Sequence, residues 1–466
     1  MDLNQIFKEY DIRGVSGETL NREVFYAVGV AFTEYFQLAD TLIVVGFDMR
    51  ETGVEYSDAF IEGALDAGAK EILNLGQVST DALYFASGHY KAAGAMFTAS
   101  HNPSQYNGLK LCLPYALGVS RENGLQTIKE QAQRIINEGY MKPYQVLGTV
   151  KKVDIMADYA VKLRSMVGLE NASSLKIVVD AGNGMAGLTV PAVFGATETQ
   201  ESLPYEIIPM FFELDGDLPN HPADPLNPKN LRDATRKIKE AKADLGIVFD
   251  GDADRCFILD EKGRAISPSI VSSIIAESIM KTYEGDIKPT MLYSALTSRE
   301  FKETLDRLEV DAVRIKVGHS TAKQVMKDTG ALFAGEHSAH YYFKDFYGAD
   351  SGMLAALMFL KIMNEENMKA SQLAQKHSIY FQSGEINFTV KSYDKVLEKI
   401  ETLFGDKHFE YYDGLTVTFD DGSPFWWWFN VRPSNTEPLV RLNVESNSKF
   451  LMTKMKELLA DVISTS

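Results

Sequence analysis

The segment TASHNPSQYNGLK, residues 98–110, gathers a serine, a histidine and a lysine into one short loop. Its Asn-Pro and Asn-Gly pairs favour turns, because proline fixes φ and glycine accepts positive φ. The loop directly follows the apolar run AAGAMF, which is typical of a buried strand. Polar groups on a loop held by a rigid strand serve chemistry more often than packing. Taken alone, however, the segment fits an ordinary solvated turn equally well.

The segment FDGDADRCFILDE, residues 249–261, places carboxylates at the alternate positions Asp250, Asp252 and Asp254. An EF-hand shares this carboxylate spacing, but it needs glycine at its sixth position and a helix on each side. Here Arg255 takes the sixth position and both flanks are strand-like. Three carboxylates beside a strand repel each other unless a cation is present. Because Mg²⁺ prefers carboxylate oxygens, the segment predicts a magnesium site.

The same segment allows a second interpretation. An apolar run followed by D-x-D resembles the nucleophile motif of haloacid dehalogenase phosphotransferases, in which Asp250 would carry a phosphoryl group. That family usually has Thr or Val two places after its second aspartate, where this chain has Asp254. The third carboxylate favours the cation site, and the Asp250 nucleophile stays as an alternative.

Two further polar segments are GEHSAH at 335–340 and RPSNTEP at 432–438. The second combines an arginine with small polar residues, which supply the guanidinium and turn donors that a phosphate dianion needs. A serine, a metal site and a phosphate site together indicate phosphoryl transfer. The chain has no Walker A sequence, so the donor need not be a nucleotide.

These loops must be positioned by strands, and short β-branched runs such as TLIVVGFD, LKIVVDAG and LGIVFDGD recur between longer amphipathic stretches. Strands that are apolar on both faces and spaced by helices indicate mixed or parallel sheets covered by helices. Ligands in such sheets bind beyond the carboxyl ends of the strands. The length of 466 residues predicts about three or four domains, with boundaries near 150, 260 and 375.

The last ninety residues form a different pattern, a small α+β unit of strands closed by a helix. In that helix the residues predicted to line one face against a sheet are Leu451, Met455, Leu458, Leu459 and Val462. The aromatic run FWWWF, residues 425–429, alternates between the two faces of a strand, so its tryptophans are assigned to packing. The segment GNGMAG, 182–187, matches a dinucleotide-binding pattern but lacks the acidic residue that should follow, and we interpret it as a strand-to-helix turn.

The composition excludes several classes of partner. A formal net charge of −17 argues against nucleic acid or an anionic membrane surface. The two cysteines, Cys112 and Cys256, indicate neither a disulfide framework nor a zinc site. The N-terminus does not resemble a signal peptide, and no apolar run reaches the length of a membrane span. We therefore expect a cytoplasmic protein, either a monomer or a small homo-oligomer.

The four polar segments, in this order, resemble the α-D-phosphohexomutase superfamily and, within it, the phosphomannomutase/phosphoglucomutase branch. Further matching segments are EYDIRG at 9–14, DAGNGM at 180–185, LPNHPADP at 218–225 and KVGHS at 316–320. The resemblance implies a heart-shaped α/β protein with three related α/β domains with mixed sheets and a C-terminal α+β domain similar to the TATA-binding-protein fold. The expected ranges are 1–150, carrying the serine loop, 151–260, carrying the metal loop, 261–375, carrying the sugar loop, and 376–466, carrying the phosphate loop.

The resemblance also implies roles for individual residues. Ser100 is similar to the serine that is phosphorylated in the working enzyme, and its phosphate would complete a Mg²⁺ site made by Asp250, Asp252 and Asp254. Arg255 would lie against that phosphate, and His101 and Lys110 match the general acid/base positions. The residues expected to contact substrate are Tyr10, Arg13, Lys316, His319, Glu336, Ser338, His340, Arg432, Ser434, Asn435 and Thr436.

The implied reaction interconverts hexose 6-phosphate and hexose 1-phosphate through a phosphoserine and a hexose 1,6-bisphosphate, with Mg²⁺ as cofactor and the bisphosphate as activator. We expect mannose phosphate to be the preferred substrate and glucose phosphate to be accepted too. Three alternatives remain: phosphoglucomutase as the main activity, the Asp250-nucleophile phosphotransferase, and a catalytically idle phosphosugar-binding protein.

Overall fold

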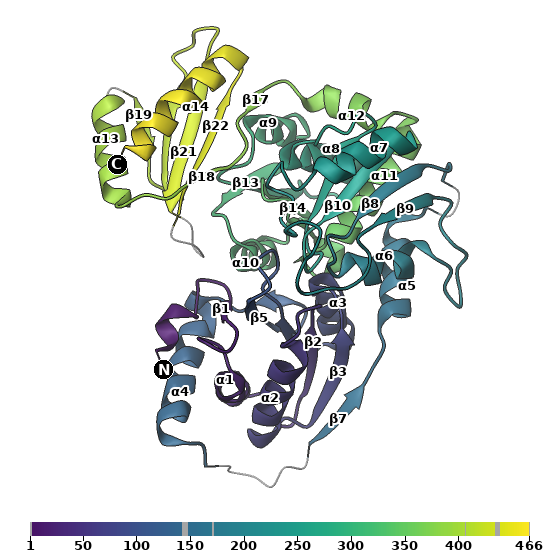
Figure 1. The fold of residues 1–466 in the computed structure, drawn as a ribbon. Coiled ribbons are helices and arrows are strands. Elements are labelled where there is room, and N and C mark those ends of the chain that lie inside the picture. The colour runs from purple at the N-terminus through teal and green to yellow at the C-terminus, as the bar shows by residue number, and fades with distance from the viewer. Residues whose placement is uncertain (1, 142–147, 170–171, 406, 434–438, 466) are drawn as a thin grey trace.

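The computed structural model describes residues 2–141, 148–169, 172–405, 407–433 and 439–465. Four sheets follow one another along the chain, each with its own helices (Figure 1). The fold is α/β with mixed sheets in the first three domains, as predicted. The domain boundaries expected near 150, 260 and 375 stay predictions. No helix in the described part of the chain combines the length and the apolar character needed to cross a bilayer.

The first sheet holds the serine loop. Its strand order is β1 (Ile12–Val15), β5 (Tyr106–Leu113), β4 (Ala93–Phe97), β2 (Leu42–Phe47), β3 (Glu71–Gln77) and β7 (Thr149–Lys152), and β6 (Leu117–Gly118) pairs with β5. Its helices are α1 (Arg22–Tyr35), α2 (Gly53–Asp66), α3 (Thr80–Tyr90) and α4 (Gln126–Glu138). Strands β2, β3, β4 and β7 run parallel, and β5 returns antiparallel to β4. This reversal closes the loop that carries Ser100.

The second sheet holds the acidic loop, residues 250–255, which contains the three predicted aspartates. Its order is β11 (Cys256–Asp260), β10 (Leu245–Phe249), β8 (Lys176–Asp180) and β9 (Glu206–Met210), with helices α5 (Met156–Val167), α6 (Ala186–Phe194) and α7 (Arg232–Ala241). Every residue of β10 is buried, as expected for a strand covered on both faces. Strands β10 and β11 pair antiparallel, so the segment between them is a tight hairpin loop.

The third sheet holds the GEHSAH loop. Its order is β13 (Asp311–Ile315), β12 (Thr290–Ser294), β14 (Phe333–Gly335), β15 (Tyr341–Phe343) and β16 (Ala349–Asp350). The helices are α8 (Pro268–Lys281), α9 (Arg299–Arg307), α10 (His319–Thr329), α11 (Gly352–Glu366) and α12 (Ala370–His377). A single apolar cluster runs through the first three sheets, from Val44 on β2 through Val178 on β8 to Met291 on β12. These three domains therefore share continuous apolar packing.

The fourth sheet is antiparallel and has a separate apolar core. Its order is β17 (Phe381–Gln382), β22 (Val440–Ser446), β21 (Trp427–Pro433), β20 (Leu415–Phe419) and β19 (His408–Glu410), β18 (Ile386–Phe388) pairs with β22, and the helices are α13 (Tyr393–Leu403) and α14 (Lys449–Ser464). Figure 1 shows this domain, in yellow, at one end of the molecule. Polar bonds tie it to the third domain, including Ser267 Oγ to Gln382 Oε1 at 2.7 Å.

Two predictions about the fourth domain have different outcomes. Helix α14 packs on the sheet as expected, but Leu458 is 41% exposed and does not face it. The helical spacing places Leu459 and Ile463 at the centre of the buried stripe, so Leu458 lies at its edge. The packing role is confirmed for two of the three tryptophans: Trp427 lies in the domain core, and Trp426 lies under the guanidinium of Arg299 from the third domain, whereas Trp428 lines a cavity.

Candidate active site

Ser100 lies on the loop between β4 and β5 and is only 5% exposed. Its φ of 50° puts it in the left-handed region, and its backbone N–H donates to Thr98 Oγ1 at 2.8 Å. The strained conformation turns the hydroxyl toward the second domain, where Ser100 Oγ donates to Asp250 Oδ2 at 2.9 Å. A serine hydroxyl thus meets a carboxylate across a domain boundary.

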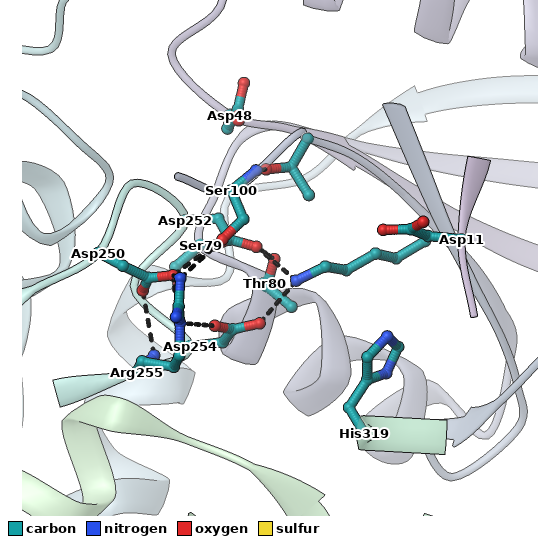
Figure 2. A network of polar contacts seen from close by, with 12 residues as sticks. Asp11, Asp48, Ser79, Thr80, Ser100, Asp250, Asp252, Asp254, Arg255 and His319 are labelled. Carbon is teal, nitrogen blue, oxygen red and sulfur yellow. Dashed lines mark hydrogen bonds and ion pairs between the residues drawn. The ribbon is translucent and has the colours of Figure 1, made fainter. Parts of the chain in front are cut away.

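The acidic loop brings all three predicted aspartates together, and each is at most 1% exposed. Figure 2 shows Asp250, Asp252 and Asp254 converging with Arg255 below Ser100. Their carboxylate oxygens lie within 4.8 Å of one another, a spacing that could hold a metal ion. Asp252 Oδ1 and Asp254 Oδ1 are buried and have no hydrogen-bond partner among the described residues. Orphaned hard oxygen atoms of this kind fit a divalent cation such as Mg²⁺.

Two cations balance the carboxylates. Lys110 Nζ lies 2.6 Å from both Asp252 Oδ2 and Asp254 Oδ2. Burial would lower the pKa of Lys110, but the two aspartates outweigh burial and raise it well above its ordinary value. Burial would likewise raise the pKa of Asp252, but the lysine charge lowers it. Arg255 Nε donates to Asp250 Oδ2 at 2.8 Å, and its backbone N–H donates to Asp250 Oδ1 at 3.1 Å.

Asp250 and His101 show opposite pKa shifts. Burial raises the pKa of Asp250, and Asp254 and Asp252 add to this effect against the opposing charge of Arg255. Burial and Arg255 lower the pKa of His101 well below its ordinary value, which favours the neutral imidazole. His101 Nδ1 lies 2.7 Å from Arg255 Nη2 and 3.2 Å from Ser100 Oγ. The imidazole therefore contacts both the serine and the arginine.

Two glycines permit the close approach of these loops. A Cβ atom on Gly251 would lie 2.5 Å from the carbonyl oxygen of Ser100, and one on Gly184 would lie 2.5 Å from the carbonyl oxygen of Gly251. Gly184 belongs to the GNGMAG segment, which forms the turn between β8 and α6 as the sequence predicted. The backbone N–H of Met185 donates to the Gly251 carbonyl at 2.9 Å. The turn therefore packs against the backbone of the acidic loop at Gly251.

A cavity of about 630 Å³ lies in front of this cluster and is lined by residues of all four domains. The third domain contributes the GEHSAH loop, in which Ser338 Oγ donates to Glu336 Oε2 at 2.9 Å and lies 2.9 Å from His340 Nδ1. His340 Nε2 lies 3.7 Å from Asp254 Oδ1 and 4.0 Å from Asp350 Oδ2. The GEHSAH loop therefore lies beside the three aspartates, with His340 as the residue that contacts them.

The fourth domain supplies positive charge at the cavity. Arg432 on β21 and Arg441 on β22 are direct cross-strand partners, and both line the cavity. Glu385 bridges them, with Oε2 at 3.2 Å from Arg432 Nη2 and Oε1 at 3.0 Å from Arg441 Nη1. Arg432 Nε is buried without a partner among the described residues. The predicted phosphate-loop residues Ser434, Asn435 and Thr436 lie outside the part of the chain that the structure describes.

The remaining predicted site residues divide into two groups. Tyr10, Arg13 and His319 line the cavity, and Tyr10 OH donates to the carbonyl of Val317 at 3.1 Å. Burial raises the pKa of Tyr10 to about 12. Lys316 is exposed, places its Nζ 5.9 Å from the centre of the Tyr412 ring and is not among the described residues that line the cavity.

Sequence reasoning missed several residues of the cavity wall. These are Lys8, Asp11, Asp224, Lys229, Glu385 and Arg441. Arg441 could have been suspected only from its pairing with Arg432, and that register depends on the turn between the two strands. The EYDIRG and LPNHPADP segments contain Asp11 and Asp224, so the motifs marked their surroundings without assigning either residue.

Comparisons with known proteins agree with this architecture. Four phosphoglucomutase/phosphomannomutase family models match the chain: alpha/beta/alpha domain I over residues 4–138, domain II over 157–263, domain III over 267–380 and the C-terminal domain over 385–462. A phosphomannomutase of Vibrio cholerae is 34% identical over 462 residues, covering 97% of this chain and 97% of that protein.

Two further relatives extend the likeness. A phosphomannomutase/phosphoglucomutase of Pseudomonas aeruginosa is 32% identical, covering 97% of this chain and 94% of that protein. The crystal structure of a phosphoglucomutase/phosphomannomutase family protein from Burkholderia thailandensis superposes with a TM-score of 0.85 at 28% identity, covering 100% of this chain and 98% of that one. The chain therefore belongs to the phosphoglucomutase/phosphomannomutase family and is an enzyme, a phosphohexomutase.

Proposed function

We propose that the enzyme interconverts hexose 6-phosphate and hexose 1-phosphate through a phosphoserine at Ser100, with mannose phosphate preferred and glucose phosphate accepted. The observation that carries this proposal is the contact of Ser100 Oγ with Asp250 at 2.9 Å and with Arg255 Nη2 at 3.3 Å, inside a cavity shared by four domains. A phosphate on this hydroxyl would meet a guanidinium and the acidic cluster at once.

The proposed chemistry is two phosphoryl transfers. In the first, the bond between phosphorus and Ser100 Oγ breaks, a bond to the free sugar hydroxyl oxygen forms, and the hydroxyl proton passes to a base. His101, whose lowered pKa keeps the imidazole neutral, is the candidate base, and Lys110, whose raised pKa keeps its amine protonated, is the candidate acid. In the second, the bisphosphate turns so that its other phosphoryl group faces Ser100: the bond between that phosphorus and its sugar oxygen breaks, a bond to Ser100 Oγ forms, and the serine proton is passed to the sugar oxygen. Mg²⁺ bound by Asp250, Asp252, Asp254 and a phosphoserine oxygen would neutralise charge on the transferred group.

Substrate recognition is assigned to two parts of the cavity wall, one from the third domain and one from the fourth. Glu336, Ser338 and His340 offer acceptors and donors to the sugar hydroxyls, with His319 beside them. Arg432 is proposed to hold the phosphate that does not react, because a buried guanidinium with an unpartnered Nε suits a dianion. Arg441, its cross-strand partner, would add charge at the same place.

The contacts of Asp250 argue against the Asp-nucleophile alternative. Its Oδ1 accepts the Arg255 backbone N–H, and its Oδ2 accepts Arg255 Nε and the Ser100 hydroxyl. Both carboxylate oxygens are therefore engaged in hydrogen bonds, and the Ser100 hydroxyl also contacts the arginine, at 3.3 Å from Arg255 Nη2. An idle binding protein would not need this arrangement at the serine.

The test is a mutase assay with Mg²⁺ and a catalytic amount of hexose 1,6-bisphosphate, run on mannose 1-phosphate and glucose 1-phosphate. We expect turnover of both sugars and a higher kcat/KM for mannose 1-phosphate. Ser100→Ala should reduce kcat by more than about 10³-fold, as expected when a covalent nucleophile is lost. Ser104→Ala, an exposed change in the same loop, is the matched control and should leave kcat unchanged. Failure on both sugars would overturn the proposal.

A further inference from the structure

A second cavity, of about 270 Å³, lies where the second, third and fourth domains meet. This volume equals about nine water molecules at roughly 30 Å³ each, enough for a small organic molecule. Apolar side chains form much of its wall, among them Leu231, Phe257 and Leu296, and Trp428 closes it from the fourth domain. The inference drawn from this cavity does not depend on the proposed function.

The cavity lies against the face of the fourth sheet that is opposite the domain core. On β22 the core takes Leu442 and Val444, so Asn443 and Glu445 point the other way. Glu445 is directly opposite Trp428 on β21, and both line the cavity. The sheet therefore presents an aromatic ring and a carboxylate side by side to this space.

Two polar side chains in the cavity wall carry atoms that the fold leaves unsatisfied. Glu445 is 1% exposed: its Oε1 accepts the Ser298 hydroxyl at 2.9 Å and the Arg299 N–H at 3.3 Å. Its Oε2 is buried with no hydrogen-bond partner among the described residues, and the same holds for Asn443 Nδ2. Leaving a buried polar atom unpaired costs roughly 1–3 kcal/mol, so Glu445 Oε2 marks a place for a missing hydrogen-bond donor, whereas Asn443 Nδ2 is itself a donor and needs an acceptor.

The charges around the cavity select the type of partner. No lysine or arginine is among the described residues that line it. Arg299 lies nearby, but its guanidinium is engaged by Glu303 at 2.9 Å and by Asp420 at 2.7 Å. Burial raises the pKa of Glu445 to about 8, and Glu300 and Glu303 add to the effect. Glu445 therefore holds its proton through neutral pH; a cation beside it would favour the ionised carboxylate, and an anion such as a sugar phosphate would disfavour it.

We propose that this cavity binds a small organic ammonium ion with an apolar body. The ammonium group pairs with Glu445 Oε2 and lies near the face of the Trp428 indole, which attracts cations. The apolar body fills the space beside Phe257 and Leu231. Ser100, the three aspartates and Arg255 do not line this cavity, so the proposed ammonium site is separate from the proposed active site.

The site has a physical connection to the central cavity. Glu385 and His337 line both cavities and lie 3.2 Å apart, Oε2 to Nε2. Glu385 also contacts Arg432. On β22, Glu445 is four residues from Arg441, a separation of about 13 Å along a strand. An ammonium ligand would therefore bind to the same sheet face that presents the arginines and would fix the fourth domain against the second and third.

The test uses a matched pair of probes on the full-length protein, 2-phenylethylammonium and its neutral analogue 2-phenylethanol, by titration calorimetry at pH 9, above the pKa of about 8 of Glu445. We expect the ammonium to bind at least tenfold more tightly than the alcohol. Glu445→Gln, which preserves side-chain volume, should abolish this preference and leave the alcohol affinity unchanged. The matched control is Glu398→Gln, an exposed change of equal charge on α13, which should preserve the preference.

A second variant guards against misfolding of the first. Trp428→Leu keeps an apolar wall but removes the aromatic face, and it should weaken ammonium binding several-fold more than alcohol binding. Alcohol binding by either variant reports that the cavity is intact. Equal affinity of the unchanged protein for both probes, no measurable ammonium binding at millimolar concentration, or ammonium binding that persists in Glu445→Gln would each overturn the proposal.

Discussion

Gly251→Ala tests whether the contact between the serine loop and the acidic loop sets the rate. The added Cβ would lie 2.5 Å from the Ser100 carbonyl oxygen and 3.2 Å from its carbonyl carbon. Ordinary van der Waals contact begins at 3.4 Å, so the two loops must separate by about 1 Å. The obstacle is backbone, and no side-chain rotation removes it. A displacement of this size at a reacting centre costs roughly 10²-fold in rate.

The assay for Gly251→Ala is kcat/KM in the mutase reaction, with unfolding by urea to verify that the variant is folded. We expect about a 10²-fold loss of kcat/KM and a loss of stability of about 1–3 kcal/mol from overpacking. Gly405→Ala is the matched control, because a Cβ there would have, among the described residues, only the Glu401 carbonyl oxygen within 4 Å, at 3.3 Å. A folded Gly251→Ala protein with kcat/KM within twofold of the unchanged enzyme would refute the reasoning.

Three further predictions concern charges in the fold. Burial opposes protonation of His377, but Glu277 and Glu300 raise its pKa to about 9. The ion pairs of His377 should therefore stabilise the fold fully below pH 6.5 and lose that effect as the pH rises through 9. His377→Gln should therefore cost up to about 3 kcal/mol in urea unfolding at pH 6 and much less at pH 10, and an equal cost at both would contradict the assignment. Lys110→Met leaves Asp252 and Asp254 without their lysine partner, so we expect about 3–5 kcal/mol lower stability, partly restored by millimolar Mg²⁺. Thermal unfolding of the variant with and without Mg²⁺ measures this effect. If Mg²⁺ does not restore stability, the result would count against a cation site. Treatment of the unchanged enzyme with EDTA should abolish mutase activity and Mg²⁺ should restore it, whereas full activity in EDTA would exclude the metal requirement.

The sequence predicted the strands and the loops that follow them because local signals determine both. Continuous apolar runs marked the buried strands β4 and β10, and the turn residues after them marked the loops of Ser100 and Asp250. The family resemblance then placed four loops at one site, which local periodicity alone cannot do. The structure brings Ser100 within hydrogen-bonding distance of Asp250, and Lys110 within hydrogen-bonding distance of Asp252 and Asp254.

Other features depend on tertiary geometry that a single sequence does not specify. The pairing of Arg432 with Arg441 depends on strand register. Glu385, which directly precedes β18, contacts both arginines. Lys316 belongs to a matching motif, yet its side chain lies against Tyr412 outside the cavity. The unpaired Oε2 of Glu445 becomes visible only when three domains are packed together.

The measurement that tests the central claim most directly is peptide mapping by mass spectrometry of protein primed with hexose 1,6-bisphosphate, before and after addition of mannose 1-phosphate or glucose 1-phosphate. The account predicts phosphate on Ser100 that is lost to either sugar, and lost faster to mannose 1-phosphate. Phosphate on Asp250, or no phosphate on the primed protein, would contradict it.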